Sequence, residues 1–249
     1  MSLEIKVVPT DFGDIWLRAR FSRQAPDRPI LLIIRGAFAR LDDWTILTQV
    51  FRQADVVIAD LPGFNCPGLS VASVPEFALA FEQAIDSAFS DRKVVVFGMS
   101  IGGLVAMSLR NARVAGVIAC DPPLTTIDLW PLRAMLREYV ERETTTPYML
   151  QWVEKVFGVT AEGAVNVDYT GLLDHLPRPT TIIVATEPLE PERPVSSIPG
   201  LINAADRKRI FAMTDIGCFS SKGGHNVALQ DKWTVAATIN LALYGADRL

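Results

Sequence analysis

The sequence predicts an α/β fold with a mostly parallel, eight-stranded sheet and helices on both faces. Short apolar runs such as "ILLII" (30–34) and "VVVF" (94–97) have the composition of strands buried on both faces. Most of these runs alternate with segments of helical periodicity, as in strand–helix–strand crossovers. At 249 residues, 49% of them hydrophobic, the chain is long enough to bury one large core.

The elements are expected in the following order. Leu3–Val8 and Ile15–Arg20 are predicted to form an antiparallel pair of strands. Six further strands are predicted: Ile30–Arg35, Val56–Asp60, Val94–Phe97, Val117–Cys120, Thr181–Ala185 and Arg209–Met213. Helices are predicted over Asp43–Gln53, after the capping box that begins at Ser73, after the glycines around residue 102, and over Trp233–Tyr244.

One region, residues 124–169, interrupts this alternation. It has no strand pattern, and it contains two helical patterns, Leu129–Glu143 and Pro147–Phe157. A crossover between parallel strands needs about a dozen residues or more, and this segment is several times longer. We therefore expect a division into a core (1–123 and 170–249) and a helical cap (124–169); the alternative is two ordinary crossover helices.

The sequence "GMSIGG" (98–103) places one hydroxyl between glycines, where a predicted strand turns into a helix. Gly98 and Gly102 leave room for a tight turn, and Ser100 stands at its apex. Free N–H groups and the helix dipole favour negative charge at such a helix start, which suits a serine nucleophile that forms an oxyanion. The structural alternative is a helix-capping serine with packing glycines.

A serine hydroxyl needs a base within hydrogen-bond reach, and histidine has a suitable pKa. The chain has two histidines. His225 follows two glycines after the last predicted strand and is the candidate base. His175, in "LLDHLPRP", is expected on the surface at a helix end.

Four segments in this order carry a family resemblance: "RGAFARLDDW" (35–44), "DLPGFNCPG" (60–68), "GMSIGG" (98–103) and "GGHNVALQDKW" (223–233). Together they resemble the α/β-hydrolase fold superfamily, in its compact capped branch of esterases, carbon–carbon bond hydrolases and lactonases. The resemblance covers nearly the whole chain. It implies a Ser100–His225–acid triad, the chain order Ser…acid…His, and no metal or organic cofactor.

The resemblance leaves three candidates for the acid. Glu187, in "TEPLEP" after the strand Thr181–Ala185, matches the usual position best, although an aspartate is usual there. Asp121, in "VIACDPP" directly after the strand Val117–Cys120, is the alternative, and Glu190 is a third candidate. We expect Glu187 to orient His225.

The oxyanion hole is expected to use the backbone N–H groups of Ile101, directly after the nucleophile, and of Ala37. In the family a histidine usually precedes this second donor, and here Arg35 takes that place. We expect Arg35 to brace the loop from Asp42, Asp43 or Asp60; contact with an anionic substrate is the alternative. Asp60 is expected to have a structural role.

Composition restricts the partners. The net charge is −4 and there is no basic tract, so nucleic acid is not expected. No apolar run has the roughly 18 residues of a membrane span, and no signal peptide is apparent. Three scattered cysteines, Cys66, Cys120 and Cys218, indicate free thiols and a cytoplasmic location. The expected partner is a small-molecule substrate, and the chain is expected to be a monomer or a homodimer.

The predicted function is a serine hydrolase that cleaves an ester-like bond in a small or medium, fairly apolar substrate through an acyl-enzyme. Two alternatives remain open at this point. One is a lyase or carbon–carbon bond hydrolase that uses the same residues. The other is a catalytically silent ligand-binding protein, which the departures at Arg35 and after the seventh strand favour.

Overall fold

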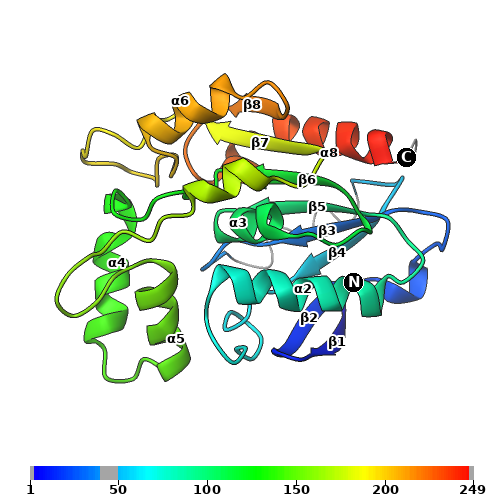
Figure 1. Cartoon of the computed structure of the whole chain (residues 1–249), viewed down its shortest axis with the longest axis horizontal. Helices are drawn as coiled ribbons and strands as arrows, with labels where there is room; N and C mark the ends of the chain where they lie inside the picture. The colour runs from blue at the N-terminus through cyan, green and yellow to red at the C-terminus, as the bar shows by residue number, and fades with distance from the viewer. Residues whose placement is uncertain (1–2, 40–49, 247–249) are drawn as a thin grey trace.

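The computed structural model describes residues 3–39 and 50–246. Its centre is an eight-stranded sheet with the strand order β1-β2-β4-β3-β5-β6-β7-β8 (Figure 1). Strand β2 is antiparallel to both of its neighbours, and the pairs from β4 to β8 are parallel. The predicted fold class, with its mostly parallel eight-stranded sheet, is therefore confirmed.

The described strands agree with the expected ones to within a few residues, with one exception given below. In chain order they are β1 (Glu4–Thr10), β2 (Gly13–Ala19), β3 (Ile30–Ile34), β4 (Asp55–Ala59), β5 (Val94–Met99), β6 (Val114–Cys120), β7 (Thr180–Ala185) and β8 (Gly217–Ser221).

Helices pack on both faces of the sheet. Those of the described residues are η1 (Phe21–Arg23), α2 (Val74–Ala88), α3 (Ile101–Ser108), α4 (Trp130–Glu141), α5 (Pro147–Gln151), η3 (Trp152–Val156), η4 (Thr170–His175), α6 (Ala204–Ala212), α7 (Val227–Gln230) and α8 (Lys232–Ala246). Alternate residues of β3 belong to different cores, because successive side chains of a strand point to opposite faces. Leu32 packs with residues of α2 and α3, whereas Leu31 packs with residues of α8.

The segment 124–169 contains α4, α5 and η3 and projects from the side of the sheet to which β7 points (Figure 1). Its two ends lie together, because the Tyr169 N–H donates to the Leu124 carbonyl over 2.7 Å. One side of the segment is fixed to the core by Trp152. This side chain is fully buried, stacks on Phe77 of α2 with ring centroids 4.8 Å apart, and donates to the Pro62 carbonyl over 2.8 Å.

One predicted strand is wrong. Most of Arg209–Met213 lies in helix α6, whose N-cap Asn203 accepts a hydrogen bond from the Asp206 N–H over 2.8 Å. A short apolar run does not distinguish a strand from a helix by itself. The eighth strand is the less apolar "GCFSS" of β8, which escaped prediction because an edge strand with one neighbour needs little apolar surface.

Other expectations have mixed outcomes. Ser73 caps α2 by accepting from the Glu76 N–H over 3.3 Å, as predicted. The predicted helix Asp43–Gln53 lies mainly outside the described residues.

None of the described helices has the length and apolar character needed to cross a membrane. All three cysteines are free.

Candidate active site

Ser100 lies at the junction of β5 and α3, in the tight turn that the glycine spacing predicts. Its backbone has φ +56° and ψ −124°, and its N–H donates to the Cys120 carbonyl of β6 over 2.8 Å. The Ser100 side chain makes no capping hydrogen bond to α3. Ser100 therefore occupies a left-handed conformation that is unusual for a residue with a side chain, and its hydroxyl has no role in helix capping.

The glycines around Ser100 are required by close contacts between backbones. A Cβ atom at Gly98 would lie 2.0 Å from the Gly102 carbonyl oxygen, and one at Gly102 would lie 2.3 Å from the Ile34 carbonyl oxygen. Neither distance is sterically possible. These contacts hold the start of α3 against the ends of β3 and β5, so the turn presents Ser100 at the carboxyl edge of the sheet.

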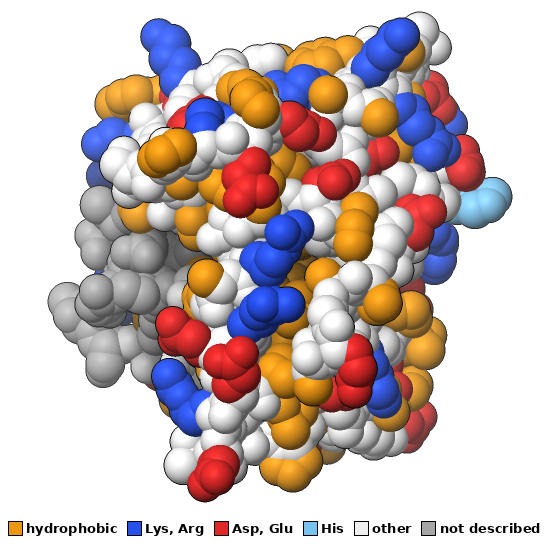
Figure 2. All heavy atoms as spheres, turned by 90° about the vertical axis from the view of Figure 1, so that its left-hand side faces the viewer, with side chains coloured by type: hydrophobic (Ala, Val, Ile, Leu, Met, Phe, Trp, Pro, Cys, Tyr) orange, Lys and Arg blue, Asp and Glu red, His pale blue; other side chains and the backbone are white. Residues whose placement is uncertain are grey.

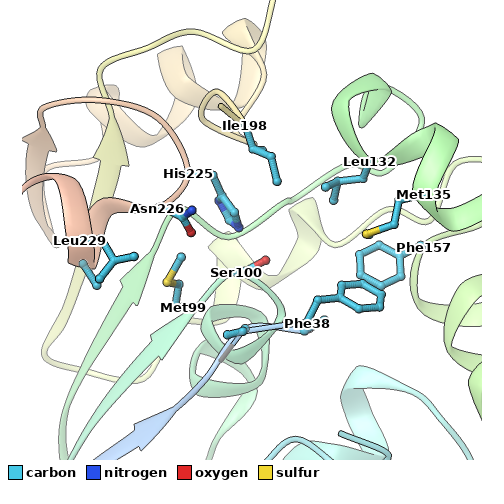
Figure 3. Close-up of a pocket in the computed structure, with 14 residues that line it drawn as sticks. Phe38, Met99, Ser100, Leu132, Met135, Phe157, Ile198, His225, Asn226 and Leu229 are labelled. Atoms are coloured by element: carbon cyan, nitrogen blue, oxygen red, sulfur yellow. The ribbon is translucent and has the colours of Figure 1, made fainter. Parts of the chain in front are cut away.

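His225 lies in the loop between β8 and α7 and is 7% exposed. The backbone N–H of His225 donates to the Ile198 carbonyl over 2.9 Å. Gly224 makes this approach possible, since a Cβ atom there would lie 2.2 Å from the same carbonyl oxygen. In Figure 3 the His225 ring and the Ser100 hydroxyl point toward one another.

Asp121 holds the other side of the His225 ring. Its Oδ2 atom lies 2.7 Å from His225 Nδ1 and also accepts from the Leu201 N–H over 2.8 Å. The Asp121 side chain is fully buried. Its backbone is fixed by a 2.8 Å hydrogen bond to the Ile183 carbonyl of β7, with φ +45°. A buried carboxylate here favours the tautomer with the proton on Nδ1 and leaves Nε2 for Ser100.

The structure does not bring Glu187 to the His225 ring, and this corrects the expected contact. The Glu187 Oε1 atom pairs with Arg193 Nη2 at 3.2 Å, and both side chains are about one-third exposed. Arg193 also donates to the Pro188 and Pro191 carbonyls, so it folds the loop after β7 around itself. Among the described residues, the carboxylate that hydrogen-bonds to the His225 ring is that of Asp121 and not that of Glu187.

Glu190 is also engaged elsewhere: its Oε1 atom accepts from the Ala204 N–H over 3.2 Å, at the start of α6. His175, at the end of η4, is exposed as expected. Of the candidate side chains, the structure thus brings together Ser100, His225 and Asp121.

The loop after β3 also approaches Ser100. A Cβ atom at Gly36 would lie 3.1 Å from the Ser100 Cβ atom, so Gly36 permits the approach. Ala37 follows it and lines the same cavity as Ser100. Ile101 is the first residue of α3, so its N–H has no acceptor within the helix.

The buried side chain of Arg35 braces this loop, as expected. Its side chain is 2% exposed, pairs with Asp60 and donates to the Ala39 carbonyl over 2.7 Å. Asp60 is fully buried and also binds Arg18 Nε at 2.5 Å. One carboxylate thus joins two guanidinium groups, and Arg35 is not among the residues that line the cavity at Ser100. The alternative supports Asp42 and Asp43 lie outside the described residues.

Ser100 and His225 face a cavity of about 280 Å³ (Figure 3). Most of its walls are apolar, and they come from the loop after β3, from α4, from the end of η3 and from the histidine loop. The lining residues are Gly36, Ala37, Phe38, Ala39, Met99, Ser100, Leu132, Met135, Phe157, Ile198, His225, Asn226, Ala228 and Leu229. The outer face around α4 and α5 is mixed, with acidic and basic side chains between apolar ones (Figure 2).

Several lining residues carried no clear functional signal in the sequence. Leu132 lies one helical turn from Met135 on α4, so helical spacing beside Met135, which the sequence suggested as a lining residue, could have identified it. Ile198 and Asn226 come from irregular loops, where no periodicity marks the residues that face a cavity. Their places depend on contacts between distant parts of the chain.

Cys120 lies directly before Asp121 but does not offer a competing nucleophile. Burial raises the pKa of the Cys120 thiol well above its usual value, and the nearby Asp121 carboxylate adds to this effect. The thiol is therefore protonated at neutral pH, and a protonated thiol is a poor nucleophile.

Comparison with known families gives one sequence match. The model of the alpha/beta hydrolase family matches residues 31–237 of the chain. This range includes Arg35, Ser100, Asp121 and His225. No curated protein sequence matches the chain closely enough to count as a relative.

Solved structures share the fold at low sequence identity. A mutant of the N-acyl homoserine lactonase AidH in complex with N-hexanoyl homoserine has 13% identity and a TM-score of 0.69, over 100% of this chain and 98% of that one. The carboxylesterase CesB from Bacillus subtilis has 16% identity and a TM-score of 0.68, over 98% and 93%. A thermophilic esterase from Thermogutta terrifontis has 16% identity and a TM-score of 0.65, over 98% and 99%.

Proposed function

Since the chain belongs to the alpha/beta hydrolase family and the protein is a hydrolase, we propose that it cleaves carboxylic esters of small, largely apolar substrates through Ser100, His225 and Asp121. The observation that carries this proposal is the buried 2.7 Å contact between His225 Nδ1 and Asp121 Oδ2, behind a ring that points toward Ser100. This is the arrangement that a serine nucleophile needs: a base beside the hydroxyl and a carboxylate beyond the base.

The proposed reaction has two halves. In the first, Ser100 Oγ attacks the carbonyl carbon, and His225 Nε2 takes its proton and returns it to the leaving alcohol. In the second, water attacks the acyl-enzyme by the same proton transfers and releases the acid. Asp121 keeps the proton on Nδ1 and stabilises the imidazolium. The N–H groups of Ala37 and Ile101 donate to the oxyanion of each tetrahedral intermediate.

We propose that the segment 124–169 is a cap that sets the shape of the substrate site. Leu132 and Met135 of α4, together with Phe157, form an apolar wall of the cavity. The ends of the segment meet at the Tyr169–Leu124 hydrogen bond, as expected for an insertion into the core. Because Trp152 fixes the cap to α2, the cap acts as a fixed wall, and a cavity of about 280 Å³ suits short substrates.

The test compares Ser100→Ala with Ser90→Ala, which alters an exposed serine before β5. On p-nitrophenyl acetate, butyrate and octanoate, we expect Ser100→Ala to lower kcat/KM by about a thousandfold or more and Ser90→Ala to leave it unchanged. A fluorophosphonate probe should label the wild type and not Ser100→Ala, and butyrate should be cleaved faster than octanoate.

Two results would overturn the proposal. If folded wild-type protein neither reacts with the fluorophosphonate nor cleaves any of the esters, the ligand-binding alternative is favoured. If Ser100→Ala cleaves the esters at the wild-type rate, the nucleophile lies elsewhere. The second conclusion requires Ser100→Ala to keep the wild-type melting temperature.

A further inference from the structure

A second hollow, of about 290 Å³, lies at the opposite edge of the sheet from Ser100. Its walls come from the turn after β2, from the residues before β4 and from the first residues of β4. The lining residues are Arg20, Arg23, Gln24, Arg28, Phe51, Arg52, Ala54, Asp55 and Val56. We call this hollow the arginine pocket.

The arginine pocket is separate from the candidate active site. Asp55 is the first residue of β4, and it hydrogen-bonds to the Pro29 carbonyl just before β3. The pocket is therefore at the amino ends of the parallel strands, whereas Ser100 follows the carboxyl end of β5. It shares no lining residue with the cavity at Ser100.

The charge of the pocket is strongly positive although the whole chain carries −4. Four arginines line it, and none of their side chains makes a hydrogen bond or ion pair with another of the described residues. The one acid of the lining, Asp55, is already engaged: its Oδ2 atom accepts from the Ala25 N–H over 2.8 Å and pairs with Arg92 at 2.6 Å. Asp55 thus has little capacity left to neutralise the four guanidinium groups.

Two buried donors in the lining also have no acceptor among the described residues. These are Arg20 Nε and Gln24 Nε2. The orientation of the Gln24 amide is fixed by Arg92 Nη1, which donates to Oε1 over 3.4 Å and so leaves Nε2 as the donor. A buried donor without an acceptor is unfavourable, and an oxygen-rich ligand in the pocket would supply acceptors to both.

We propose that the arginine pocket binds a soluble small molecule that carries a phosphate or diphosphate group. Planar guanidinium groups bind phosphate oxygens through paired, charge-assisted hydrogen bonds. Four such groups in one hollow favour an anion with several negative charges over a single carboxylate. A cation is disfavoured, because the one carboxylate of the lining is already used. The proposal goes beyond the hydrolase activity and does not depend on it.

The first test is calorimetric titration of the full chain with inorganic pyrophosphate at low ionic strength. Wild-type protein should bind, and Arg20→Gln should raise the dissociation constant about tenfold or more, since it removes a charged donor from the wall. The matched control is Arg137→Gln, the same change at an exposed arginine of α4. It should bind pyrophosphate like the wild type.

A second variant covers the case in which Arg20→Gln fails to fold. Gln24→Glu replaces the buried amide donor by a carboxylate and should weaken pyrophosphate binding by about tenfold or more, without removing an arginine. The proposal is overturned if wild type does not bind pyrophosphate, or if both pocket variants bind like the Arg137→Gln control. It is also overturned if the protein sediments with phosphatidylglycerol vesicles while pyrophosphate neither binds nor competes, because the arginines would then form a membrane-binding surface.

Discussion

Two neighbouring loops at the carboxyl edge of the sheet each present a carboxylate near His225, and they differ in what surrounds it. Asp121, after β6, is fully buried and bonds to the His225 ring and the Leu201 N–H. Glu187, after β7, is about one-third exposed and pairs with Arg193. Burial therefore identifies the carboxylate that pairs with His225 better than its position in a sequence motif does. A buried carboxylate must be paired, whereas a half-exposed one gains little from its partner.

A buried charge is also costly to disturb. Arg35 and Asp60, at the end of β3 and β4, are as buried as Asp121. The loop after β7, by contrast, is held by an arginine that is itself 29% exposed. We therefore expect large effects from changes at Asp121 and Arg35 and small effects from changes at Glu187.

The largest expected effect is that of Asp121→Asn. An amide in this place favours the wrong tautomer of His225 and does not stabilise the imidazolium, so kcat for a short ester should fall about ten-thousandfold. The volume of the side chain hardly changes, so the melting temperature should stay within a few degrees of the wild type. Ester kinetics and thermal unfolding measure both quantities. A variant that kept even a tenth of the wild-type kcat would remove Asp121 from the proposed triad.

The next effect is on stability and concerns Arg35→Met. Breaking a buried ion pair costs about 3–5 kcal/mol because one charge is left uncompensated. Arg18 would still bind Asp60, so we expect a loss of free energy of unfolding near the lower limit, about 3 kcal/mol. Urea denaturation measures it. The double variant Arg35→Met with Asp60→Asn should lose less than the sum of the single losses; additive losses would contradict the direct coupling.

A smaller effect is expected from Gly224→Ala, which tests how the loop after β7 positions the histidine. The added Cβ atom would meet the Ile198 carbonyl oxygen at 2.2 Å, so the backbone must shift. Such overpacking costs about 1–3 kcal/mol, and the moved His225 should lower kcat more than it raises KM. Gly171→Ala is a matched control, since a Cβ atom there has no neighbour within 4 Å. Equal kinetics for both variants would show that this contact does not position His225.

The smallest effect is expected from Glu187→Gln. The partly exposed pair with Arg193 is worth about 0–1 kcal/mol, and the Glu187 carboxylate does not contact the His225 ring. We therefore expect kcat/KM within about threefold of the wild type, which is a free-energy change of less than 1 kcal/mol. Measured beside Asp121→Asn on the same ester, this variant decides between the two loops. A collapse of activity here would restore Glu187 as the acid.

The fold and two members of the candidate triad could be predicted from the sequence because their signals are local. Strand and helix periodicity indicated the sheet. Glycines two residues on either side of Ser100 indicated a turn in which backbones nearly touch, and the structure has those contacts. Two glycines before His225 similarly indicated a close approach. Each signal lies within a few residues of the feature that it predicts.

The position of the carboxylate beside His225 was decided only by the tertiary structure. Asp121 and His225 are 104 residues apart, and their contact depends on how β6, β7 and the segment around Ile198 pack together. The motif after β7 favoured Glu187, but that carboxylate pairs with Arg193, six residues further on. The sequence thus predicted most of the strands, the turn at Ser100 and the edge of the sheet that carries the site. Which charged groups are buried together there is a matter of long-range packing, because burial and pairing are properties of the folded chain.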